Sequence, residues 1–193
     1  QAYEAAFAGF EASLNGGAAS PLHVRRREAM KHLLADGLPT ARDEAWRHTN
    51  PAALARTFYA PVATPGTVAA SDIEPFAAAG IDGPLLVFVD GHYADGLSRR
   101  DELPGGVRVR RLTDAAGDLH LTPHAMGESR TFAALSTAFV RDGAVVEVDE
   151  DSACDTPIQV LHVSTGAAVD GVPGLTAPRI HVHAGARSRV SVL

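Results

Sequence analysis

The sequence has one cysteine, Cys154, and one lysine, Lys31, among its 193 residues. One cysteine excludes an internal disulfide and any Cys-x-x-Cys metal or redox pair. The lysine does not follow the glycine-rich segment of a P-loop, so that kind of nucleotide site is excluded as well. We interpret Cys154 as a small packed residue, because free cysteine is among the residue types most often buried.

Several other common signals are missing. No strand is followed by Gly-x-Gly-x-x-Gly, and no Gly-x-Ser-x-Gly segment of a hydrolase is present. No apolar run approaches the roughly 20 residues that span a bilayer. The first ten residues carry no basic segment typical of a secretory signal. We therefore expect a cytoplasmic protein without a membrane segment. A catalytic Ser-His-Asp site is not excluded, since the sequence contains nine histidines, but no pattern identifies one of them as catalytic.

Positive charge is also scarce. The net charge is −6, which argues against nucleic-acid binding. Short arginine clusters occur at Arg25–Arg27 and at Arg108, Arg110 and Arg111. Acidic residues flank both clusters in the chain, so we interpret them as solvated surface.

The ends of the chain suggest a portion of a longer protein. The sequence does not begin with methionine, and it stops at Ser191-Val192-Leu193 inside strand-like alternation. An open apolar strand at the end of a domain leaves an unpaired sheet edge. We expect an amino-terminal portion whose open edge leads to self-association.

Residues 1–142 predict a mixed α+β domain. Tyr3, Phe7, Phe10 and Leu14 recur at helical spacing, and Asn15-Gly16 favours a stop. Ser20-Pro21 and Gly37 predict the two ends of a second helix. Thr40 with Asp43 predicts a short capped helix, and residues 128–140 a final amphipathic one. Residues 59–71 read as a linker. Strands are expected at 85–89, 93–97 and 107–112, with Asp90-Gly91 as a hairpin turn.

The pattern changes at Gly143. From there to Leu193 helical periodicity is absent, and short β-type runs alternate with polar or Gly/Pro turns. The expected strands are 144–148, 158–163, 179–182 and 189–192. Residues 143–193 therefore predict an all-β part that follows the mixed domain.

Metal binding is the sharpest chemical hypothesis that the residues alone support. His181 and His183 are two apart in an expected strand and would share a face, with His162 as a third ligand. A cupin-like enzyme holds its metal with such a pair, but it also uses a glutamate shortly afterwards. Arg187 and Arg189 occupy that stretch instead. We favour the interpretation that Ile180, Val182 and Ala184 face inward and that both histidines bind no ion.

Other histidines have less support. His48 beside Asp43 and Glu44 is interpreted as part of an ordinary surface pairing. His120 and His124 flank Pro123 in an expected loop and suggest no specific chemistry.

Longer segments carry a family resemblance. They lie in order along nearly the whole chain: Gly37–Thr49 (GLPTARDEAWRHT), Leu86–Tyr93 (LVFVDGHY), Leu103–Val107 (LPGGV), Phe132–Phe139 (FAALSTAF), Asp142-Gly143, Pro157–His162 (PIQVLH) and Pro178–Ile180 (PRI). Together they resemble the amino-terminal half of SufD proteins, in the SufB/SufD family. Ser136 stands where that family usually has asparagine, and the family is considerably longer.

The resemblance implies a fold and a function. It implies a helical and mixed α+β domain over 1–142, followed by the first coils of a right-handed parallel β-helix over 143–193. It implies a non-catalytic scaffold of the Suf iron–sulfur cluster assembly complex, acting with a SufB-like paralogue and a SufC-like ATPase. The cluster-building residues and the ATPase-binding surface would lie outside this chain. No catalytic, cofactor-binding or metal residue is therefore assigned, and Trp46 with Arg42-Asp43-Glu44 is expected to pack and cap.

Two alternatives stay open at this point. One is the cupin-like metal enzyme that uses His162, His181 and His183. The other is a carbohydrate- or wall-associated β-helix protein, which the missing signal segment disfavours.

Overall fold

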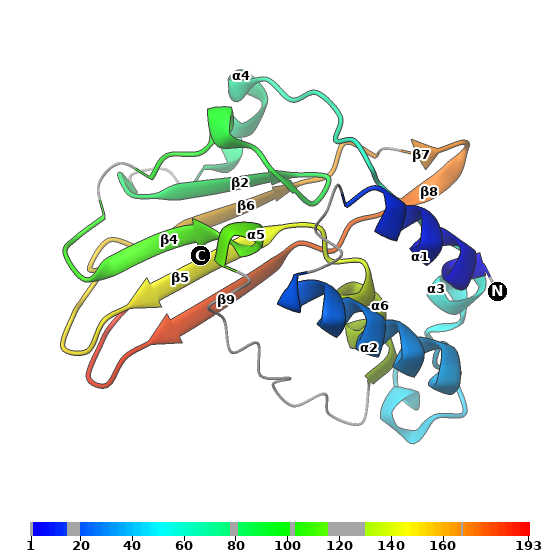
Figure 1. Ribbon diagram of the computed structural model, residues 1–193. Coiled ribbons are helices and arrows are strands. Elements are labelled where there is room, and N and C mark those ends of the chain that lie inside the picture. The colour runs from blue at the N-terminus through cyan, green and yellow to red at the C-terminus, as the bar shows by residue number, and fades with distance from the viewer. Residues whose placement is uncertain (1, 15–19, 78–80, 101–102, 116–129, 167) are drawn as a thin grey trace. The chain divides into compact units, whose positions relative to one another are not determined.

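The computed structural model describes residues 2–14, 20–77, 81–100, 103–115, 130–166 and 168–193 (Figure 1). The chain forms two compact units, and each is assembled from three stretches of sequence. The first unit contains Gln1–Ala63, Ala116–Val140 and Ala168–Ala177, and the second contains Thr64–Ala115, Arg141–Ala167 and Pro178–Leu193. Among the described residues, no helix is long and apolar enough to cross a membrane.

Helices make up most of the first unit. Its elements are α1 (Ala2–Ala12), α2 (Pro21–Asp36), the 3-10 turn η2 (Glu44–Trp46), α3 (Ala52–Arg56), β1 (Ala60–Pro61), α6 (Arg130–Ala138), β7 (Ala168–Val169) and β8 (Val172–Leu175). Strand β8 pairs in parallel with β1 and antiparallel with β7. The expected linker thus contains a short paired strand, because β1 finds its partner more than a hundred residues later.

Local signals set the ends of α2 as expected. The hydroxyl of Ser20 accepts a hydrogen bond from the backbone N–H of His23, and Pro21 occupies the first helical position. Gly37 closes the helix with φ +71°, and its N–H donates to the carbonyl of Leu33. The stop expected at Asn15-Gly16 lies outside the described residues.

The short helix expected after Thr40 is reduced to a 3-10 turn at Glu44–Trp46. The expected contact between Thr40 and Asp43 is present, since the backbone N–H of Thr40 donates to Asp43 Oδ2 at 2.6 Å, but Asp43 makes no side-chain capping bond to the turn. Trp46 packs edge-to-face on Phe132 with ring centroids 5.3 Å apart. The expected packing of Trp46 is thus confirmed.

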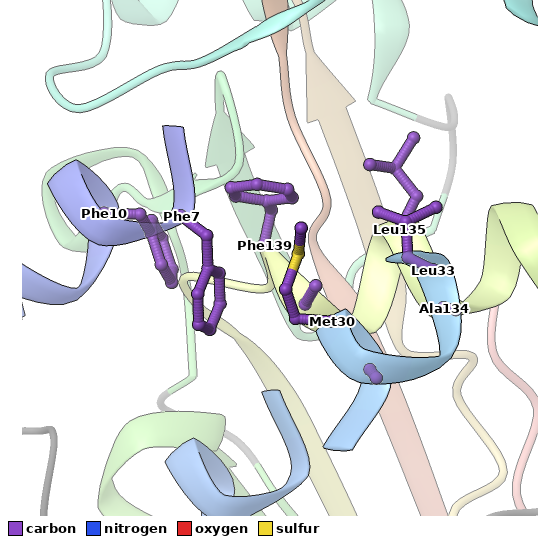
Figure 2. Close-up of a cluster of buried hydrophobic side chains, with 9 residues drawn as sticks. Phe7, Phe10, Met30, Leu33, Ala134, Leu135 and Phe139 are labelled. Atoms are coloured by element: carbon purple, nitrogen blue, oxygen red, sulfur yellow. The ribbon is translucent and has the colours of Figure 1, made fainter. Parts of the chain in front are cut away.

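Aromatic side chains fill the core of the first unit, where α1, α2 and α6 meet (Figure 2). The buried cluster consists of Phe7, Phe10, Ala29, Met30, Leu33, Ala134, Leu135, Ala138 and Phe139. Phe139 makes edge contacts with Phe7 at 5.8 Å and with Phe10 at 5.6 Å between centroids. Such pairs add to the free energy gained by burying the rings.

Two small sheets form the second unit. Its elements are α4 (Ala70–Ile73), the 3-10 turns η3 (Glu74–Phe76) and η4 (Asp95–Leu97), β2 (Leu85–Val89), β3 (His92–Tyr93), β4 (Val107–Arg111), α5 (Leu112–Ala115), β5 (Gly143–Val148), β6 (Gln159–Val163) and β9 (Arg179–Ala184). The strand orders are β3-β2-β6 and β4-β5-β9. The expected hairpin at Asp90-Gly91 is confirmed, with Val89 opposite His92.

The sheets share a buried core. It contains Leu86 and Phe88 from β2, Val107 from β4, and Ala144, Val146 and Val148 from β5, together with Cys154 and Ile158. These strand residues recur at every second position, so one face of each sheet points into this core. No helix follows Val140 among the described residues, as the change of pattern at Gly143 predicts.

Candidate functional site

Parallel pairing organises residues 143–193. Gly143 pairs with Arg179 and Val148 with Ala184, so β5 and β9 pair at an offset of 36 residues. The bridge between Ala153 and Arg189 keeps this offset, and the parallel bridge between Ile158 and Val192 has an offset of 34 residues. A second stretch therefore retraces the path of the first, as Figure 1 shows for β5 and β9.

The turns after β5 and β9 repeat as well. Asp151 and Arg187 occupy equivalent positions, 36 residues apart, and both are left-handed, with φ of +59° and +56°. The N–H of Asp151 donates to the carbonyl of Ala186 at 3.0 Å. The guanidinium of Arg187 reaches back to Asp151 and Glu150. Ion pairs and backbone bonds thus hold one turn on the other.

The stacked strands approach closely at Gly143. A Cβ atom at this position would lie 2.0 Å from the carbonyl oxygen of Arg179. The backbone atoms of Arg179 cannot move away without breaking the pairing of β5 with β9, so a residue without a side chain is needed here. Gly143 is thus an essential part of the stack.

An apolar edge ends the stack. Strand β9 is the last strand of its sheet among the described residues. In register, Ile180, Val182 and Ala184 continue the inward face of β5. Val182 is 48% exposed, and Leu193, which pairs with β6 through Ile158 and Val160, is 59% exposed. We call β9 together with Arg189–Leu193 the open edge.

Strand β4 lies at the other side of the same sheet and is rich in arginine. Arg108 pairs with Asp149, Arg110 with Glu147 and Arg111 with Asp142. The hydrogen bonds and charge of Arg108 lower the pKa of Asp149. Charged side chains on an edge strand discourage pairing with another chain, so the two edges of this sheet differ.

The arginine clusters correct one sequence interpretation. Arg26 is 2% exposed and donates through Nε to the carbonyl of Val140 at 2.8 Å. It belongs to the core of the first unit, because Val140, just after the end of α6, is fully buried and its carbonyl needs a donor. Arg110 and Arg111 are also partly buried against carboxylates. The interpretation of the clusters as solvated surface was wrong for Arg26, whereas Arg25, Arg27 and Arg108 are exposed.

The three histidines of the cupin-like alternative do not converge. His162 lies on β6, and His181 and His183 lie on β9 in the other sheet. In register, His181 and His183 stand on the face opposite the inward residues of β9. Partial burial lowers the pKa of His162, whose ring packs on Phe88. No group of three potential metal ligands occurs in the described part of the chain.

An acidic neighbour of this pair was missed. Glu147 stands beside His183 in register, although no acid follows the histidines in the sequence. The parallel pairing brings it there from 36 residues earlier. Its carboxylate accepts two hydrogen bonds of 3.0 Å from Arg110. Glu147 is thus engaged by a cation and is a poor ligand for a second one.

Cys154 is packed, as expected. It is 2% exposed, lies in the core of the second unit, and its Sγ donates to the carbonyl of Thr156 at 3.2 Å. Burial, and then the charge of Asp155, raise the pKa of the thiol. A raised pKa disfavours the reactive thiolate.

A buried carboxylate escaped the sequence reasoning. Asp90 is 2% exposed and accepts hydrogen bonds from the backbone N–H groups of Gly66 and Thr165, both 2.9 Å, and from the Thr165 hydroxyl at 2.6 Å. Burial alone would raise its pKa, but these bonds outweigh it and the pKa is lowered. Asp90 joins three loops and has a structural role.

The remaining histidines add no site. His48 accepts a hydrogen bond from Arg47 Nε at 2.9 Å on the surface. His120 and His124 lie outside the described residues. The described residues therefore present a stacked β scaffold with an open edge.

Comparison with known proteins gives two matches. Residues 1–160 match the family described as the SufBD protein N-terminal region. A curated iron–sulfur cluster assembly SufBD family protein of Synechocystis sp. (strain PCC 6803) is 28% identical over 179 residues. The match covers 89% of this chain and 38% of that protein. The chain thus spans less than half the length of the curated relative that it matches.

Proposed function

This chain belongs to the SufBD protein family, whose N-terminal region it matches, and we propose that it is part of a scaffold subunit that supports iron–sulfur cluster assembly. The family match covers more than half of the chain. The relative is named for cluster assembly, and this function comes to the present chain as a proposal.

The observation that carries a scaffold role is the stacked pairing of β5 and β9. An offset of 36 residues that is repeated at the bridge between Ala153 and Arg189, and is 34 residues at the bridge between Ile158 and Val192, is typical of successive coils of a solenoid. We propose that residues 143–193 are the first coils of a right-handed parallel β-helix and that the open edge receives the next coil. Solenoid repeats contact only their neighbours, so each coil serves as a template for the one after it.

The proposed subunit is of the SufD type and has no catalytic residues in this chain. Cys154 is buried with a raised thiol pKa, and the three histidines are spread over two sheets. The partners are a SufB-like paralogue and a SufC-like ATPase. The cluster is then the cargo of the whole complex and is held by residues outside this chain.

Co-purification tests this proposal. The full reading frame containing this chain is tagged and co-expressed with the SufB-like and SufC-like proteins of the same organism. We expect the full-length protein to recover both partners. We expect the 193-residue chain to recover no ATPase, because the resemblance places the ATPase-binding domain beyond it. Recovery of neither partner by the full-length protein, with both expressed, contradicts the scaffold role.

A further inference from the structure

Every polar side chain that lines a small cleft in the second unit carries a hydrogen-bond donor. Tyr93 from β3, Arg100 after η4, and Arg110 and Arg111 from β4 surround it, and the rest of its lining is aliphatic side chains and glycine. None of these lining side chains offers a carboxylate or amide acceptor. We call it the arginine–tyrosine cleft.

The hydroxyl of Tyr93 is the unusual group in this cleft. Its oxygen is buried and, among the described residues, it has no hydrogen-bond partner. The guanidinium carbon of Arg100 lies 5.5 Å from the centroid of the Tyr93 ring, and that of Arg111 lies 5.6 Å from it. A buried hydroxyl without a partner is unfavourable, because it has lost its hydrogen bonds to water and gained none in return. The Tyr93 hydroxyl would therefore be stabilised by a hydrogen-bond acceptor from a bound ligand.

The arginines keep donor capacity for a ligand. Arg111 donates to Asp142, and Arg100 donates to Asp95. A guanidinium carries five N–H donors, more than one carboxylate takes up. Several cationic donors and a phenolic O–H therefore meet around one small space. The ligand that matches them has only acceptors and negative charge, which describes a small oxyanion.

The cleft is narrow in the described arrangement, and Arg100 is one of the side chains that line it. The space is too narrow to admit a water molecule. The ion pair of Arg100 with Asp95 is on the surface, with the two side chains 41% and 79% exposed. Exposed ion pairs contribute little to stability, so rotation of Arg100 away from Asp95 requires little free energy.

We propose that the arginine–tyrosine cleft binds a small oxyanion of the phosphate or sulfate type. The anion enters when Arg100 rotates, accepts the hydrogen bond of the Tyr93 hydroxyl, and is held by the spare N–H donors of Arg100 and Arg111. Gly143 and Ala144 of β5 also line the cleft, so the site adjoins the stacked strands, but it does not depend on the proposed scaffold role.

Titration of the 193-residue chain tests this site. Inorganic phosphate, and sulfate in a second arm, replace chloride at constant ionic strength, and binding is followed by calorimetry. Tyr93→Phe keeps the ring and removes only the hydroxyl, and Arg100→Gln removes one cation. We expect saturable binding that each variant weakens about tenfold, as loss of a hydrogen bond to a charged group does. Arg25→Gln, in an exposed pair with Glu28, is the control and should bind like the wild type.

Thermal unfolding gives a second readout. Without phosphate, Tyr93→Phe should unfold at the same or a higher temperature, because it loses a hydroxyl that has no partner. With phosphate, the wild type should gain stability and the variant should gain much less. Absence of saturation, or equal binding by the wild type and Tyr93→Phe, overturns the proposal. Circular dichroism establishes that each variant is folded.

Discussion

The guanidinium of Arg26 donates to the carbonyl oxygen of Val140 at 2.8 Å, across 114 residues of sequence. Arg26 lies in α2, and Val140 follows the end of α6, whose last carbonyl groups lack partners within the helix. The guanidinium also lies 5.5 Å from the centroid of the Phe10 ring. One side chain thus joins all three helices around the core of the first unit.

Replacement of Arg26 should therefore weaken the first unit strongly. Arg26→Met keeps much of the aliphatic stem but leaves the Val140 carbonyl without its donor. We expect a loss of about 2–3 kcal/mol in the free energy of unfolding, which is the range for a buried polar group left unpaired. Urea denaturation measures it. Arg25→Met, on the exposed side of the same helix, should change stability by less than about 0.5 kcal/mol. Equal effects of the two variants would contradict the buried role.

Asp90 should make stability depend on pH below neutrality. Its pKa is lowered in the folded chain, so the folded state releases the proton more readily than the unfolded state. Its contribution is present above the ordinary aspartate pKa of about 3.9 and is lost as the pH falls through the lower folded value. Asp90→Asn tolerates the left-handed φ of +46° but removes the charge.

Urea midpoints measured from pH 7 to pH 3 check this effect. We expect Asp90→Asn to be less stable than the wild type by about 2 kcal/mol at pH 7, the range for hydrogen bonds to a charged group. This difference should shrink below about pH 4, where the Asp90 carboxylate of the unfolded chain takes up a proton more readily than that of the folded chain. Asp82→Asn, at an exposed position of the same unit, should show no such trend. A difference that is constant over the whole pH range contradicts the ionised role of Asp90.

Sequence patterns predicted elements whose signals are local. Ser20-Pro21 and Gly37 define the ends of α2, and Asp90-Gly91 forms the expected turn, because each signal acts within a few residues. The positions of β5, β6 and β9 followed from apolar runs in the same way. The interpretation of Cys154 as a packed residue rested on its type alone and was confirmed.

Long-range partners were beyond such patterns. No sequence pattern near Asp90 predicts its hydrogen bonds from Gly66 and Thr165. Likewise, no pattern near Arg26 predicts its hydrogen bond to the carbonyl of Val140. Pairing of β2 with β6 also joins segments 74 residues apart. A usable signal did exist for the stack, since Val-Glu-Val at 146–148 and Ser152 recur as Val-His-Ala at 182–184 and Ser188. Both recur at the spacing of 36 residues.

Gly143 should be intolerant of any side chain. In Gly143→Ala the new methyl group would lie 2.0 Å from the carbonyl oxygen of Arg179, and β5 and β9 would have to separate. We expect a loss of more than about 2 kcal/mol in the free energy of unfolding, as for other strained core positions. Gly96→Ala is the matched control, because no atom lies within 4 Å of its Cβ position. Urea denaturation curves of the two variants measure the difference in the free energy of unfolding. Equal stability would show that β5 and β9 can accommodate a side chain at position 143.

The open edge should drive self-association of the 193-residue chain. Strand β9 has one strand neighbour among the described residues, and the side chains of Val182 and Leu193 on the open edge expose apolar surface. Such an edge pairs readily with another chain, whereas the arginines of β4 protect the opposite side of the sheet. Light scattering after size-exclusion chromatography should therefore show dimers or larger species whose fraction rises with concentration.

A single substitution tests whether the self-association arises from the open edge. Val182→Lys places a charge on the exposed strand and should shift the chain toward monomer, because a charged edge resists strand pairing. Val24→Lys provides the control, since Val24 is exposed to a similar degree but lies on α2 in the first unit. We expect it to leave the association unchanged. Equal loss of association in both variants would point to general hydrophobic attraction, and a wild-type chain that stays monomeric at all concentrations would remove the open edge as an interface.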